Sequence, residues 1–144
     1  MNTVMDKVQD ISFVSIKVGD QASMTKTVSE ADINKFADVS SDYNPVHIDA
    51  EFAKTTMFGG RIAHGMLSAA YISAVIGTRL PGKNTIYMKQ DLSFRAPVKI
   101  GDTVTATVEV IEKIDAKNRL ILKTTVTNQD GTLIVDGTAT VMKK

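Results

Sequence analysis

An acid and an imidazole stand five residues apart in the stretch S-S-D-Y-N-P-V-H at residues 40–47. Asp42 and His47 are residue types that move protons, so the pair could perform general acid–base catalysis. Pro45 disfavours helical backbone at Asn44, and Asp42 and Asn44 favour turns through bonds to the backbone. A fixed bend could therefore bring Asp42 and His47 to one side. The spacing alone is more typical of a solvated turn that follows a helix.

His64 and Gly65 are the second candidate, because they follow G-G-R-I-A and open an apolar helical segment. The N-terminus of a helix presents unpaired N–H groups and a partial positive charge. Gly65 has no side chain, so a ligand carbonyl could approach its N–H closely, as in an oxyanion hole. A glycine needed only for tight packing and a satisfied buried histidine would explain the same two residues.

Three other chemistries fit the sequence less well. Asp42, His47 and His64 could form a two-histidine, one-carboxylate iron site, but the usual H-x-D pairing is absent. A serine hydrolase of the G-x-S-x-G type is not indicated, because that motif is absent. The G-G-R string at 59–61 lacks the G-K-[ST] of a phosphate-binding loop. The sequence therefore favours acid–base chemistry without a metal.

The helices and strands that must position these residues are distributed unevenly, with most of the expected strands in the C-terminal half of the chain. Several segments are rich in β-branched residues and alternate between apolar and polar positions, and turn-like strings such as N-Q-D-G at 128–131 separate them. These patterns predict an antiparallel sheet of about five strands. The strands are expected at 22–28, 85–94, 104–111, 120–127 and 133–142.

Two helices are expected between the first strand and the others. Ser29 is a plausible N-cap, with Glu30 and Asp32 in the first turn of a helix that ends near Val39. The segment 63–77 is apolar on every face, which predicts a helix buried on all sides. Together the elements predict an α+β fold in which the antiparallel sheet wraps around a central buried helix.

Length and composition limit the class of protein. The 144 residues suit a single domain spanning 1–144, and the absence of cysteine fits a reducing compartment. The net charge of +1 and the interspersed charges suggest no nucleic-acid partner. The first twelve residues contain acids and no apolar core, so we expect no signal peptide, and no apolar run is long enough to cross a membrane. We therefore expect a cytoplasmic protein.

Several strings together resemble the MaoC-like hydratase branch of the hot-dog superfamily, and in particular its short, single-domain (R)-specific enoyl-CoA hydratases. The resemblance covers the chain from about residue 18, and the D-x-N-P-x-H string followed by H-G-M is its most specific part. The strings are S-S-D-Y-N-P-V-H-I-D-A-E-F-A at 40–53, I-A-H-G-M-L at 62–67, L-P-G at 80–82, L-S-F-R-A-P-V at 92–98 and G-D-T-V at 101–104.

This resemblance implies a hot-dog fold and a homodimer, or a higher assembly of dimers, with active sites at the interface. It implies a trans-2-enoyl-CoA substrate and an (R)-3-hydroxyacyl-CoA product, with no cofactor because CoA is part of the substrate. Asp42 and His47 are then the catalytic pair, the Gly65 N–H is the oxyanion donor, and Asn44 helps to hold the pair. An acyl-CoA thioesterase is an alternative on the same fold, although it has no use for the D-x-N-P-x-H pairing. A non-catalytic acyl-CoA-binding module is the other alternative.

The substrate-binding residues are less strongly indicated. Ser73 and Ile76 are spaced i, i+3 on the second helix, so they share a face that could line the acyl pocket. Arg95 could meet the phosphates of CoA. Asn44, which lies between Asp42 and His47, and His64, which precedes Gly65, are also expected to contact the substrate. Ordinary core packing and scattered surface charge would explain Ser73, Ile76 and Arg95 equally simply.

Overall fold

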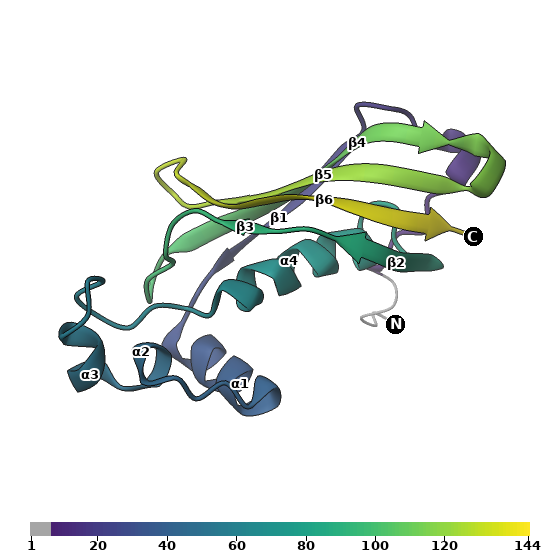
Figure 1. Cartoon of the computed structure of the whole chain (residues 1–144). Coiled ribbons are helices and arrows are strands. Elements are labelled where there is room, and N and C mark those ends of the chain that lie inside the picture. The colour runs from purple at the N-terminus through teal and green to yellow at the C-terminus, as the bar shows by residue number, and fades with distance from the viewer. Residues whose placement is uncertain (1–6) are drawn as a thin grey trace.

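One antiparallel sheet dominates the computed structural model, which describes residues 7–144 (Figure 1). Its order is β1-β4-β5-β6-β2, and the short β3 also pairs with β6. The expectation of no signal peptide rests partly on residues 1–6, which lie outside the described residues. The strands are β1 (Gln21–Thr27), β2 (Thr85–Gln90), β3 (Ser93–Phe94), β4 (Thr103–Ile114), β5 (Arg119–Thr127) and β6 (Leu133–Lys143).

Alternation of side chains gives the sheet one core face. Every second residue of β4 from Val104 to Val110 is buried, and β5 repeats the pattern from Leu120 to Val126. The register places Val108 opposite Thr124, so the buried positions of the two strands fall on the same face. The period-two pattern of the sequence therefore predicted these strands correctly.

The segment 85–94 forms two strands instead of the single strand expected from its sequence. The ladder of β2 with β6 shifts between Tyr87 and Lys89, and the chain leaves it at Asp91. The Asp91 carboxylate accepts a hydrogen bond from the Thr138 N–H, which holds the break against β6. Within residues 7–144 the sheet therefore has six strands where about five were expected.

Helix α4 (Gly65–Thr78) packs along the core face of the sheet, and this confirms the α+β prediction of a helix wrapped by an antiparallel sheet (Figure 1). The prediction that this helix is buried on every face was wrong. Met66 is 55% exposed, and Ala70, Ser73 and Gly77 on the same side are also exposed. The sheet covers only one side of α4, so the other apolar side remains open in a single chain.

Three helices form a separate group beyond the N-terminal end of α4 (Figure 1): α1 (Glu30–Ser40), α2 (Pro45–Ile48) and α3 (Ala50–Lys54). The predicted N-cap of α1 is confirmed, because Ser29 and Asp32 form a reciprocal capping box. Helices α2 and α3 were not expected, since one turn is too short to give a periodic pattern. Within residues 7–144, no helix has the length and apolar character needed to span a membrane.

Candidate active site

The stretch from Ser41 to His47 ends one helix and begins another. Ser41 adopts the left-handed conformation with φ of 67° and terminates α1. The Asn44 side chain then accepts a hydrogen bond of 3.1 Å from the Val46 N–H, and Pro45 occupies the first position of α2. The turn predicted from the sequence is therefore a linker whose Asn-Pro step starts the helix that carries His47.

The backbone around His47 fixes the tautomer of its ring. His47 Nδ1 lies 2.8 Å from the carbonyl oxygen of Ile62, which can only accept a hydrogen bond. Nδ1 therefore carries the proton in the neutral ring, and Nε2 is left as the basic nitrogen. Burial lowers the pKa of His47, although the bond to Ile62 and the charge of Asp42 oppose that shift. Near neutral pH the ring is thus a free base.

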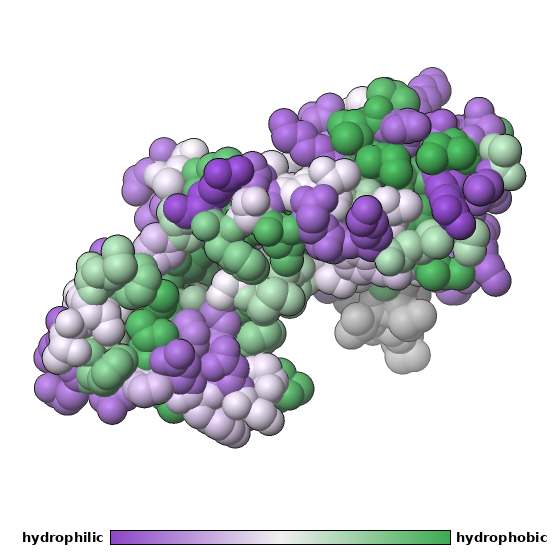
Figure 2. All heavy atoms as spheres, viewed as in Figure 1, coloured by the Kyte–Doolittle hydropathy of each residue, from purple (hydrophilic) through white to green (hydrophobic). Residues whose placement is uncertain are grey.

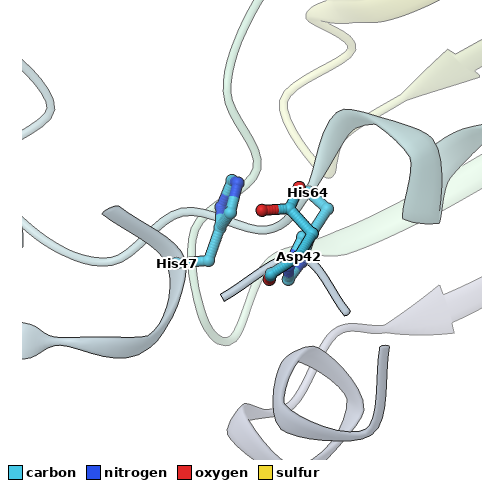
Figure 3. Close-up of side chains that lie close together, drawn as sticks. All are labelled: Asp42, His47 and His64. Atoms are coloured by element: carbon cyan, nitrogen blue, oxygen red, sulfur yellow. The ribbon is translucent and has the colours of Figure 1, made fainter. Parts of the chain in front are cut away.

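His64 supports both members of the candidate pair. It is 2% exposed, and its Nε2 donates to the backbone carbonyl of Asp42 at 3.0 Å. Its ring stacks on His47 with 3.8 Å between centroids and 25° between planes. Figure 3 shows Asp42, His47 and His64 gathered at one point, although they come from the linker, α2 and the residue before α4.

A shared metal is not the arrangement that this cluster favours. One potential ligand atom from each of Asp42, His47 and His64 lies within 4.8 Å of the others. Two imidazoles that ligate one ion must point their in-plane lone pairs at it from about 2.0–2.1 Å. Nearly parallel stacked rings direct these lone pairs side by side, so the geometry suits proton transfer better than coordination.

Gly65 is the first residue of α4, so its N–H has no acceptor within the helix. A Cβ at this position would lie 2.7 Å from Cδ1 and Cε1 of the Phe94 ring, well inside normal contact. Glycine is therefore the residue that lets the Phe94 ring close over the start of the helix. The N–H and the positive end of α4 together can stabilise a negatively charged oxygen.

A cavity of about 470 Å³ is lined by His47, His64 and Gly65, whereas Asp42 lies in the cluster beside it and is not among its lining residues. Figure 2 shows hydrophobic side chains in the hollow between the α1–α3 helices and the sheet. Polar groups occur at only a few points of its mostly apolar wall, as in pockets that bind small molecules. The lining residues are His47, Phe58, Ile62, Ala63, His64, Gly65, Met66, Ser68, Phe94, Arg95, Ala96, Pro97, Val98, Ile134 and Val135.

The structure brings together some of the predicted site residues and separates others. Arg95 lines this cavity and forms an ion pair of 3.3 Å with Asp136. Ser73 lies instead in a second cavity of about 570 Å³, between α4 and β2. Ile76 is buried in the core and lines neither cavity. Its side chain faces the core, whereas Ser73, three residues earlier on α4, faces outward.

Phe94 and Arg61 are among the site residues that sequence reasoning missed. Phe94 covers Gly65, and nothing in L-S-F-R-A-P-V distinguished it from a strand residue. Arg61 was considered only when G-G-R was compared with a phosphate-binding loop and rejected. Its side chain is 8% exposed and donates a hydrogen bond to the backbone carbonyl of His47. The signal that could have found it is a lone arginine next to the apolar run that begins α4.

Comparison with known proteins agrees with this geometry. The family model described as "MaoC like domain" matches residues 14–132. An (R)-specific enoyl-CoA hydratase of Rhodospirillum rubrum is 54% identical over 130 residues, which covers 90% of each chain. An (R)-specific enoyl-CoA hydratase of Aeromonas caviae is 44% identical over 131 residues, covering 91% of this chain and 98% of its own.

Solved structures show the same similarity in three dimensions. The R-hydratase PhaJ1 of Pseudomonas aeruginosa in its unliganded form superposes with a TM-score of 0.91 and 51% identity, over 94% of this chain and 87% of its own. The (R)-hydratase of A. caviae involved in PHA biosynthesis superposes with a TM-score of 0.88. These matches extend over the sheet, α4 and the α1–α3 helices alike.

Proposed function

Because the chain belongs to the MaoC-like family, we propose that it is an (R)-specific enoyl-CoA hydratase that acts through Asp42, His47 and the N-terminus of α4. The enzyme adds water to trans-2-enoyl-CoA to give (R)-3-hydroxyacyl-CoA, and the same groups catalyse the reverse dehydration. One observation carries the residue assignment. His47 is held as a neutral base with Nε2 free, next to Asp42 and at the cavity that reaches Gly65.

The thioester carbonyl accepts a hydrogen bond from the Gly65 N–H. This polarises the conjugated double bond, so that the β-carbon becomes electrophilic and negative charge develops on the carbonyl oxygen. The dipole of the 14-residue helix α4 adds to the stabilisation of that charge. The reaction needs no cofactor, since the CoA moiety belongs to the substrate.

His47 Nε2 removes a proton from the water that attacks the β-carbon, and Asp42 orients the same water. The Asp42 carboxylate is itself fixed, because it accepts a hydrogen bond of 3.2 Å from the Asn44 N–H. A proton then passes from the pair to the α-carbon. Because one water is held on one face of the substrate, OH and H add to the same side of the double bond. The two groups act as a coupled pair in this relay.

The remaining predicted residues take supporting places in this proposal. Asn44 caps the helix that carries His47, and His64 braces Asp42 and His47 next to the bound thioester. Arg95 stands at the cavity wall, where it can meet a phosphate of CoA. The acyl chain runs along α4, toward the side that carries Ser73; Ile76 supports the helix from the core.

We further propose that the working form is a homodimer, or an assembly of such dimers, in the cytoplasm. Strand β2 lies at an edge of the sheet and exposes Ile86, Tyr87 and Met88. Met66 is exposed on the open side of α4 and borders the second cavity together with β2. A second copy placed on this apolar edge would cover both surfaces.

Hydration of crotonyl-CoA tests the assignment, because loss of the enoyl-thioester absorbance reports turnover directly. Asp42→Asn and His47→Gln are each expected to remove nearly all activity while the protein remains folded. The matched control is Asp38→Asn, which removes a nearby carboxylate that accepts a hydrogen bond from the Tyr43 hydroxyl and does not belong to the Asp42–His47–His64 cluster. Normal turnover in either folded site variant would refute the assignment. Release of free CoA by the unmodified chain would indicate a thioesterase instead.

A further inference from the structure

Helix α2 carries His47 but is too short to hold its own position. It comprises four residues, and a single helical turn is unstable in isolation. Its orientation must therefore be imposed by the segments packed against it. Besides the Asn44 cap and the stacked His64 ring, Arg61 and Ile62 hold α2 from outside the D-x-N-P-x-H string, in the extended segment before α4.

Three hydrogen bonds attach this extended segment to α2. The Ile62 N–H donates to the Val46 carbonyl at 3.2 Å, and the Ile62 carbonyl accepts from His47 Nδ1 at 2.8 Å. Arg61 Nε donates to the His47 carbonyl at 2.6 Å. The backbone and the ring of His47 are thus held from the same two residues.

The guanidinium of Arg61 also ties α2 to α1. Its Nη1 lies 2.5 Å from a carboxylate oxygen of Glu30, and its Nη2 donates to the Asn34 side-chain oxygen at 2.7 Å. Glu30 and Asn34 are one turn apart on α1, so they receive the two ends of a planar fork. All three guanidinium nitrogens are occupied, and the side chain is nearly excluded from solvent. A lysine, with a single nitrogen, could not reproduce this arrangement.

We infer that Arg61 is a positioning residue for the hydration reaction: it fixes α2 between α1 and the segment before α4, and so holds His47 Nε2 at the substrate. This inference rests on the proposed function. It does not require Arg61 to contact the substrate, because the residue acts through the carbonyl of His47. Displacement of a catalytic group by about 1 Å can cost on the order of 100-fold in rate.

The test compares Arg61→Met and Arg61→Lys with the unmodified chain, using crotonyl-CoA hydration and histidine NMR. Arg61→Met is expected to lower kcat by about 10- to 100-fold and to change KM less than about threefold. Arg61→Lys keeps the charge but is expected to lose most of the same activity. The matched control is Lys26→Met, which removes the cation of an exposed ion pair with Asp32 on α1.

The chain has two histidines, so nitrogen NMR can follow each ring separately. In the unmodified chain, His47 is expected as the Nδ1–H tautomer, and in Arg61→Met it should become a mixture of tautomers. Glu30→Gln provides a milder variant if Arg61→Met fails to fold, and it should shift kcat in the same direction.

An unchanged kcat in the folded Arg61 variants, or an unchanged His47 tautomer, would overturn the inference. If Arg61→Met does not fold, the same outcomes in Glu30→Gln would overturn it. If the unmodified chain hydrates no enoyl-CoA, the proposed function fails. The tautomer of His47 then still decides whether Arg61 positions the ring.

Discussion

Replacement of Gly65 by alanine perturbs the start of α4 by a single methyl group. A Cβ at this position lies 2.7 Å from two atoms of the Phe94 ring, whereas carbon atoms in contact are normally about 3.5–4.0 Å apart. The ring or the helix start must therefore move by about 1 Å. Phe94 is 54% exposed, so its ring can turn away, but it then leaves the position in which it closes the cavity over Gly65.

The expected effect on activity is much larger than the effect on stability. If the Gly65 N–H is displaced from the thioester oxygen, kcat falls by up to about 10²–10³-fold, which is the cost of losing an oxyanion donor. Overpacking costs about 1–3 kcal/mol in a rigid core, and the mobile ring and the better helix propensity of alanine offset much of that. The free energy of unfolding should therefore fall by less than about 2 kcal/mol.

Gly77→Ala is the matched control on the same helix, because nothing lies within 4 Å of a Cβ built there. It should stabilise the protein by about 0.5–1 kcal/mol and leave turnover unchanged. Crotonyl-CoA hydration and urea unfolding are measured for both variants and for Gly65→Ala combined with Phe94→Ala. The double variant should recover part of the activity lost in Gly65→Ala, since removal of the ring relieves the contact. Activity of folded Gly65→Ala within twofold of the unmodified chain would refute the role of Gly65.

Two further predictions follow from the same structure. Burial lowers the pKa of His47 below its usual value of about 6.5, so the base should become neutral at a lower pH than a free histidine. The value of kcat/KM should therefore rise with pH through a midpoint below 6.5. A rise centred above 6.5 in the pH–rate profile would contradict a neutral His47 base. Ser29→Ala breaks the capping box of α1 and should lower the free energy of unfolding by about 1 kcal/mol in urea titrations, and no loss would show that the cap is not needed.

Local patterns predicted the elements whose environment is set by their own sequence. Alternation in 104–111 and 120–127 was enough to identify β4 and β5, because one face of each strand is buried and the other is not. Ser29, followed by the acids Glu30 and Asp32, identified the start of α1. The apolar segment 63–77 predicted a helix, but not that one side would stay open, because the extent of the sheet is not encoded within the helix.

The arrangement of the site depends on contacts between distant residues, which the sequence did not reveal. The D-x-N-P-x-H string suggested Asp42 and His47, but the stacking of His64 on His47 joins residues 17 positions apart. Arg61 binds Glu30 and Asn34 on α1, which lie 31 and 27 residues before it in the sequence. Ser73 and Ile76 share a helix face by spacing, yet Ile76 is buried in the core and Ser73 is exposed on the open side of α4.

Hydration of crotonyl-CoA in deuterated water tests the central claim most directly, because the product records both the face of attack and the direction of proton delivery. Chiral analysis and proton NMR of the 3-hydroxybutyryl product are the readouts. A pair formed by Asp42 and His47 that holds one water on one face predicts the (R) product, with deuterium and hydroxyl added to the same side. An (S) product, or addition to opposite sides, would contradict the account.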